Sequence, residues 1–201
     1  MNKQFSTACE RNREPILDVL SKVFADRKHV LEIGSGTGQH AVFFGAGLPH
    51  LMWQTSDLPQ NHPSILAWLQ EADLKNVLPP IALDMSNAEW ATDLLDKDMD
   101  AVFTANICHI MAWREVENMF AGVARVVQSG GKLCVYGPFN YKGQFTSSGN
   151  AQFDASLRAQ AAHMGIRDIE AMQDLASAHG LIMQADHAMP ANNRLLVWQR
   201  T

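Results

Sequence analysis

Short apolar runs alternate with segments of helical periodicity along most of this chain. Brief runs that end in glycine, aspartate or asparagine indicate strands, and apolar residues that recur every three or four positions indicate helices. The predicted strands are residues 29–33, 51–55, 77–83, 99–105, 132–136, 181–187 and 194–199. The predicted helices are residues 15–25, 39–47, 62–71, 88–95, 113–127, 153–164 and 168–179. This alternation is typical of a mostly parallel sheet with helices on both faces.

Local signals mark several ends of these elements. Pro15 suits the first position of the first helix, because a backbone N–H at that position has no partner within the helix and proline has none to offer. Ser129-Gly130-Gly131 ends the helix at 113–127, and Gly180 suits the residue after the last helix. Only a few residues separate the last two strands, so these two can pair only antiparallel. The pattern predicts an α/β fold whose seven-stranded sheet closes with a hairpin of its sixth and seventh strands.

The composition fits one globular domain. The chain has 201 residues, of which 47% are hydrophobic and 18% charged, and its formal net charge is −5. This length suits a single domain over residues 1–201 better than two. Lysine and arginine are scattered without a cluster, so we expect no nucleic-acid partner.

Residue spacing also bears on location and on metals. Cys9, Cys108 and Cys134 are odd in number and form no CxxC pair, which favours reduced thiols over disulfides. The first residues lack the apolar segment of a signal peptide, and no apolar run approaches the roughly 18 residues of a membrane span. The histidines form no HxH or HxxxH pair. We therefore expect a cytoplasmic protein without a membrane partner or a metal.

A glycine-rich loop joins the strand at 29–33 to the helix at 39–47. Glycines in such a loop let the backbone approach a bound nucleotide, where a Cβ would collide. A dinucleotide fingerprint needs Gly or Ala three residues after Gly36, where Gln39 stands. An acid two residues before the first glycine instead suits a ligand with an ammonium group, although a purely structural loop is the alternative. The loop residues assigned to such a ligand are Glu32, Gly34, Ser35, Gly36 and Gly38.

Polar residues also follow the next strands, at the sheet edge where open α/β sheets bind ligands. Asp57 follows the second strand, and its carboxylate can accept hydrogen bonds from two ribose hydroxyls. Asp84 follows the third strand and can accept from an adenine amino group, with Met85 against the ring. Asn106 follows the fourth strand and is a further candidate contact. Together with the loop, these residues predict a bound adenosine-type cofactor.

Several motifs carry a resemblance to known proteins. VLEIGSGTGQHA (residues 30–41), the acid after the second strand and the closing hairpin resemble the class I S-adenosylmethionine-dependent methyltransferases. ERNREPIL (10–17), FDASLR (153–158), GIRDIE (165–170) and PANN (190–193) resemble more closely one family of methyltransferase-like proteins of unknown function, DUF938, found in bacteria and animals. The resemblance covers nearly the whole chain. It implies a Rossmann-like methyltransferase fold and S-adenosylmethionine as cofactor, with S-adenosylhomocysteine as product, but no particular acceptor.

The residues after the fourth strand bear on the acceptor. An Asn-Pro-Pro-aromatic motif, which positions an amide nitrogen, would fall where Asn106-Ile107-Cys108-His109 stands, which disfavours a DNA-base or glutamine acceptor. His109 is a candidate general base, although it could equally pack in the turn. Tyr141, in the loop after the fifth strand, is a second catalytic candidate, or else packs over the core. Cys108 has no activating neighbour in the sequence and suits a buried, inert thiol.

Other segments are expected to converge on the acceptor. Residues 1–26 form an N-terminal cap segment and helix, and residues 137–165 form a lid over the acceptor site. Arg13 is assigned to the cofactor's carboxylate, although it could pair with the substrate's or lie unpaired on the surface. The residues assigned to the substrate are Asn12, Phe153, Arg158, Asn192 and Asn193, the last two being also suited to a turn.

The sequence thus favours a methyltransferase that acts on a small molecule. One alternative is a protein that binds S-adenosylmethionine without catalysis. A less favoured one is an NAD(P)-dependent oxidoreductase.

Overall fold

A computed structural model describes residues 3–201, so the first two residues of the expected cap segment at 1–26 lie outside the described residues. The strands are β1 (His29–Ile33), β2 (Met52–Asp57), β3 (Val77–Ala82), β4 (Met99–Ala105), β5 (Val127–Asn140), β6 (Arg167–Asp168), β7 (Leu181–Met189) and β8 (Asn193–Arg200). The helices are α1 (Thr7–Val23), α2 (Gln39–Gly47), α3 (His62–Ala72), α4 (Trp113–Val126), α5 (Ser148–Gln160) and α6 (Ile169–Ala178), with short 3-10 turns η1 (Pro59–Asn61), η2 (Thr92–Leu94) and η3 (Pro190–Asn192).

Seven strands form one sheet in the order β3-β2-β1-β4-β5-β8-β7. Neighbours from β3 to β5 pair parallel, and β8 pairs antiparallel with both β5 and β7. The mostly parallel sheet and its closing hairpin are therefore confirmed. The hairpin consists of β7 and β8, because a two-residue strand that the sequence pattern does not reveal, β6, pairs with the end of β5.

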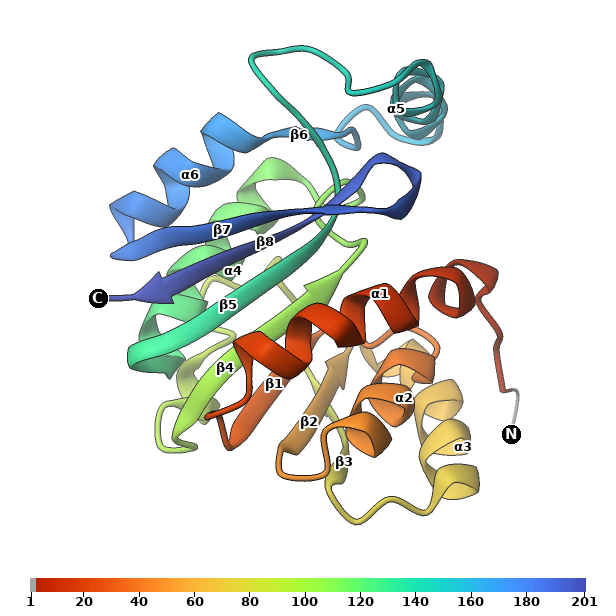
Figure 1. The fold of residues 1–201 in the computed structure, drawn as a ribbon, viewed down its shortest axis with the longest axis vertical. Coiled ribbons are helices and arrows are strands. Elements are labelled where there is room, and N and C mark those ends of the chain that lie inside the picture. The colour runs from red at the N-terminus through yellow and green to blue at the C-terminus, as the bar shows by residue number, and fades with distance from the viewer. Residues whose placement is uncertain (1–2) are drawn as a thin grey trace.

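The sheet is covered on both faces (Figure 1). On one face, α1, α2 and α3 enclose a core that contains Ile16, Phe44, Trp53 and Phe103. On the other face, α4 and α6 enclose a second core, in which the rings of Phe120 and Trp198 meet edge to face at 5.6 Å. Burial of these large apolar side chains, each contributing on the order of 2 kcal/mol or more, holds the helices against the sheet.

The first helix begins earlier than its proline suggests. Ser6 caps α1 by accepting a hydrogen bond from the Cys9 N–H at 3.3 Å, so Pro15 lies inside the helix rather than at its first position. A proline there leaves one hydrogen bond of the helix unmade. The prediction for this end of α1 was wrong because a cap outside the periodic region decides where the helix starts.

Residues 88–95 do not form the predicted helix. Only the 3-10 turn η2 is present, because Trp90 and Leu94 are drawn into the second core and leave too short an apolar face for a longer helix. The Trp90 indole N–H donates to the Asn118 carbonyl at 2.9 Å, which fixes this segment against α4.

The fifth strand is longer than predicted. β5 continues from residue 136 to Asn140, because β8 pairs with it as far as Pro138 and β6 pairs with its last two residues. The first four residues of the expected lid at 137–165 are therefore buried strand. The rest of that range contains a tight turn, α5 and the connection to β6, and α5 begins at Ser148, not at residue 153.

The carboxyl ends of the parallel strands lie together at one edge of the sheet, where a site could form. β1, β2, β4 and β5 end there, and β7 runs parallel to β5, so the β7–β8 connection at η3 lies at this edge too. This agrees with the topology expected from the sequence.

Candidate functional site

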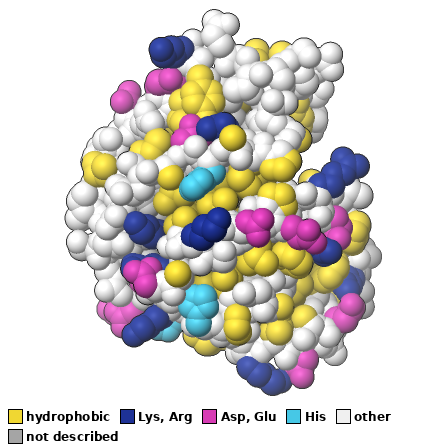
Figure 2. Space-filling model, in the orientation of Figure 1, with side chains coloured by type: hydrophobic (Ala, Val, Ile, Leu, Met, Phe, Trp, Pro, Cys, Tyr) yellow, Lys and Arg dark blue, Asp and Glu magenta, His cyan; other side chains and the backbone are white. Residues whose placement is uncertain are grey.

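Two cavities adjoin at this edge of the sheet. One has a volume of about 670 Å³ and lies among α1, α2, α5 and the β7–β8 connection; we call it the α1 cavity. The other, of about 520 Å³, lies beside Asp57 and the segments that follow β3 and β4; we call it the Asp57 cavity. Both are lined by Gly34, Gly36, Ala105 and Asn106. Figure 2 shows a notch between the lobe that holds α5 and the N-terminal half of α1, with hydrophobic side chains on its floor.

The glycine loop lies where the two cavities meet, and Gly34 and Gly36 line both of them. Gly36 has φ +57°, and a Cβ added to it would meet no atom within 4 Å, so that side chain would project into open space at the junction. Gly38 has φ +95°, and a Cβ there would lie 2.9 Å from the Ile65 Cα. Gly38 is thus required for packing, whereas the open space beside Gly36 leaves room for an extended cofactor that reaches both cavities. This is the observation on which the fit of the predicted cofactor rests.

Asp57 lines the Asp57 cavity and is held by several hydrogen bonds. Its Oδ2 accepts from the Gly36 N–H at 2.6 Å, and its Oδ1 accepts from the Leu58 N–H at 2.7 Å and the Asn61 side chain at 2.8 Å. A carboxylate has about four acceptor positions, so one is left for a ligand even before any of these bonds exchanges. Asp84, Met85 and Asn106 line the same cavity. Asn61 was not predicted, because it follows a proline turn rather than a strand.

Glu32 lies behind the loop rather than in a cavity wall. Its Oε2 accepts from the Ser35 hydroxyl at 2.8 Å and from the Trp53 indole N–H at 3.0 Å, and its side chain is buried. Ser35, which donates this hydrogen bond to Glu32, itself lines the α1 cavity. Glu32 thus helps to hold the loop through Ser35 and Trp53, and its predicted contact with an ammonium group stays a prediction.

Burial raises the pKa of the Glu32 carboxyl from 4.5 to about 7, while the hydrogen bonds from Trp53 and Ser35 act to lower it. A raised folded-state pKa stabilises the protein below the unfolded pKa, and this contribution disappears as the pH rises toward 7. We predict that the Glu32→Gln variant does not lose stability in this way as the pH rises, because it has no carboxyl group at this position. The free energy of unfolding of the variant, relative to the wild type, should rise by about 3 kcal/mol from pH 4.5 to pH 7.

Urea denaturation at a series of pH values measures this difference. His40 and His109 also titrate near this range, since burial lowers the pKa of each to about 4, and they make stability rise with pH. Both are present in the two proteins, so their contributions cancel in the comparison. A difference that stays constant with pH would contradict the assignment.

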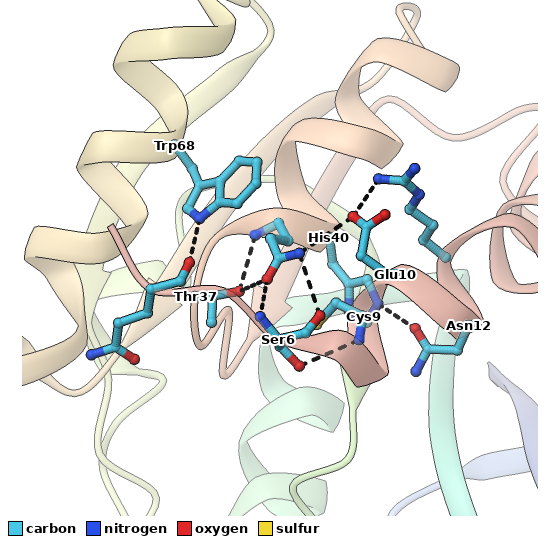
Figure 3. Close-up of polar contacts among 10 residues, drawn as sticks. Ser6, Cys9, Glu10, Asn12, Thr37, His40 and Trp68 are labelled. Carbon is cyan, nitrogen blue, oxygen red and sulfur yellow. Dashed lines mark hydrogen bonds and ion pairs between the residues drawn. The ribbon is translucent and has the colours of Figure 1, made fainter. Parts of the chain in front are cut away.

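A polar network ties the start of α1 to the glycine loop (Figure 3). The Ser6 N–H and the Thr37 hydroxyl both donate to the side-chain oxygen of Gln39. The Trp68 indole N–H donates to the Gln4 carbonyl at 2.8 Å, and Ser64 joins Gln4 to Thr37. Gln39, which argued against a dinucleotide fingerprint, thus anchors the segment that covers the loop.

The α1 cavity brings together several predicted substrate residues. Asn12, Phe153 and Asn193 line it, and the Asn12 Oδ1 lies 2.7 Å from the His40 Nε2 (Figure 3). The sequence did not single out His40, Tyr136 and Asn150, which line it as well. Tyr136 ends the predicted apolar strand at 132–136, and only its position at the carboxyl end of that predicted strand could have indicated a role.

His109 lines the α1 cavity with its imidazole buried. The ring meets that of Phe153 edge to face at 5.2 Å, and neither ring nitrogen makes a hydrogen bond to another residue within 3–201. Burial, with a smaller contribution from the Arg167 guanidinium, lowers the pKa of His109 to about 4, so the imidazole is neutral at physiological pH. A neutral imidazole on a cavity wall can accept a proton.

Besides Glu32 and Gly38, four predicted site residues lie outside both cavities. The Tyr141 hydroxyl donates to Asp186 at 2.6 Å, because the extended β5 carries this residue past the sheet edge and beside β7. Arg13 pairs with Glu10 at 2.5 Å and lies over the Phe43 ring in a separate hollow. Arg158 pairs with Asp154 at 2.7 Å. Asn192 serves the turn with φ +57°, and its carbonyl accepts from Asn150.

Two further observations concern reactive and metal-binding side chains. Cys108 is buried, and burial raises the pKa of its thiol to about 12, which leaves it protonated and unreactive. The described part of the chain holds no group of three or more His, Cys, Asp or Glu side chains placed to share a metal ion.

Among residues 3–201, no helix combines the length and apolar character that a membrane crossing requires.

Several solved structures of similar architecture are described as methyltransferases or methyltransferase family proteins. An O-methyltransferase family protein from Burkholderia thailandensis superposes with a TM-score of 0.82 at 21% identity, over 96% of this chain and 57% of that one. The S-adenosylmethionine-dependent methyltransferase SibL gives 0.77 at 18%, over 96% and 55%. An O-methyltransferase family 2 protein from Planctomyces limnophilus, in complex with apigenin, gives 0.80 at 14%, over 96% and 58%. The chain thus spans little more than half the length of these proteins.

These likenesses define the fold as that of the class I methyltransferases. The chain belongs to the family described as "Protein of unknown function (DUF938)", whose pattern it matches over residues 3–200.

Proposed function

We propose that this protein transfers a methyl group from S-adenosylmethionine to a small-molecule acceptor. The observation that carries the proposal is the pair of adjoining cavities, which share the Gly36 backbone and the end of β4. Their volumes lie within the range of roughly 300–1,000 Å³ typical of small-molecule sites. When bound, the cofactor supplies an electrophilic methyl group on a sulfonium centre.

The Asp57 cavity suits the nucleoside part of the cofactor. Asp57 would accept hydrogen bonds from the ribose hydroxyls, and Asp84 would accept one from the adenine amino group, beside Met85. Gly34, Ser35 and Gly36 would face the amino-acid part, since they line the α1 cavity. Asn106, which lines both cavities with φ +62°, would lie between the two parts.

The α1 cavity suits the acceptor. His109 would remove a proton from an acceptor hydroxyl or amine, while Asn12, Asn193 and Phe153 would orient it. Residues 141–165, including α5, would cover this side of the site within a single domain. No long single-sign charge patch is visible on the face drawn in Figure 2, which favours a small acceptor over a nucleic acid. A cytoplasmic location remains part of this proposal.

Calorimetric titration and a transfer assay test the function. Purified protein should bind S-adenosylhomocysteine with micromolar affinity and show no binding of NADH. With labelled S-adenosylmethionine and a small-molecule fraction of cell extract, it should release a labelled small product. Binding without any transfer would favour a non-catalytic binder, and binding of NADH alone would favour an oxidoreductase.

A further inference from the structure

The two cavities differ in charge. The Asp57 cavity is lined by three acidic residues, Asp57, Asp84 and Glu115. The α1 cavity has no aspartate or glutamate among its described lining residues, and Arg11 is the one charged side chain in its wall. Its histidines, His40 and His109, are neutral because burial lowers the pKa of each to about 4. An anion would therefore meet no repelling carboxylate in the α1 cavity and one attracting guanidinium.

Arg11 differs from every other arginine of the chain. Each of the others makes a hydrogen bond or ion pair, as Arg13 does with Glu10, Arg158 with Asp154 and Arg194 with Asp186. Arg11 makes none to another residue within 3–201, and it is exposed at the mouth of the cavity. Its guanidinium is thus available to a ligand.

The rest of the cavity wall is suited to the apolar body of a small molecule. Phe153 is 40% exposed and presents its ring at the wall, with Ala8, Pro138 and Pro190 among the other apolar lining residues. A planar ring can pack between such residues while its charged group stays near the mouth.

We propose that the methyl acceptor is a small carboxylate, and that Arg11 binds its carboxylate group at the mouth of the α1 cavity. A guanidinium and a carboxylate form two parallel charge-assisted hydrogen bonds, which fix the orientation of the acceptor as well as its affinity. The contact would hold the far end of the acceptor and leave its reacting group directed toward His109. The inference rests on the proposed function and names the substrate class of that site.

Two compounds of equal shape test the inference on protein saturated with S-adenosylhomocysteine. These are 4-hydroxybenzoate and its uncharged amide, 4-hydroxybenzamide, with binding followed by calorimetry or ligand-detected NMR. The wild type should bind the carboxylate about tenfold more tightly than the amide. Arg11→Gln should abolish this preference. Arg13→Gln is the matched control, because Arg13 lies on the same helix but faces a separate hollow, and it should leave the preference intact.

Three results would overturn the inference. One is equal binding of the two compounds by the wild type, and another is the absence of binding of either at millimolar concentration. The third is that Arg11→Gln weakens binding of S-adenosylhomocysteine but not of 5′-methylthioadenosine, which lacks the amino-acid carboxylate. Arg11 would then serve the cofactor. Failure of the wild type to bind S-adenosylhomocysteine would overturn the proposed function as well, whereas the three results above leave that function standing.

Discussion

Replacing Asp57 with alanine is expected to weaken the binding of S-adenosylhomocysteine by about 100-fold or more. The substitution removes the carboxylate that we propose accepts from the ribose hydroxyls, and hydrogen bonds to a charged group contribute about 1.5–3 kcal/mol each. It also removes the bond from the Gly36 N–H at 2.6 Å, which holds the loop between the two cavities. Calorimetric titration of the folded variant measures the loss.

Asp100 provides a matched control for this experiment. Like Asp57, it accepts hydrogen bonds from backbone N–H groups, at 2.8 Å from Lys28 and 2.9 Å from His29, but near the opposite end of the sheet. Asp100→Ala should lower stability and leave the affinity for S-adenosylhomocysteine within about twofold of the wild type, because its contacts are far from the site. Equal loss of affinity in both variants would refute the ribose assignment.

Replacing His109 with alanine is expected to slow methyl transfer by about 100- to 10,000-fold. In the proposed function the neutral imidazole accepts the proton of the acceptor, and no described residue holds its ring nitrogens in a hydrogen bond. The affinity for S-adenosylhomocysteine should change little. Release of labelled product from the acceptor fraction measures the rate, and titration measures the affinity.

The pH dependence of transfer adds a second readout for His109. With its pKa lowered to about 4, His109 stays neutral above that pH, so the rate should not fall between pH 8 and pH 6 through protonation of this group. His50→Gln is the control, since its ring contacts the Phe24 carbonyl away from both cavities. A full rate in His109→Ala would show that the residue only packs against Phe153.

The sheet could be predicted from the sequence because its signals are local. Each of the seven predicted strands is a short, mainly apolar run, and the few residues between the last two strands allow only an antiparallel hairpin. The failures depend on tertiary contacts. β6 has two residues and exists only because β5 offers it an edge, and the helix expected at 88–95 is lost because Trp90 is drawn into the core.

The cofactor side of the candidate site could be predicted for the same reason. Asp57 and the loop glycines follow strands, and the ends of parallel strands meet at one edge. The acceptor side depends on how a helix is rotated. Because α1 begins at Thr7, residues 11–13 are helical. Successive residues of a helix lie about 100° apart around its axis, so Arg11 and Asn12 line the cavity while Arg13 lies away from it. Without the true start of α1, the sequence could not distinguish the two arginines.

The position of Pro15 divides α1 into two halves that are held by different forces. Beyond it, Ile16 and Leu20 are fully buried in the core, whereas before it the helix and the segment leading into it are held by hydrogen bonds to α2, α3 and the glycine loop. The missing N–H of Pro15 weakens the helix at the junction. The few polar contacts before Pro15 therefore hold the part of α1 that lines the α1 cavity, whereas the core packing of Ile16 and Leu20 does not depend on them.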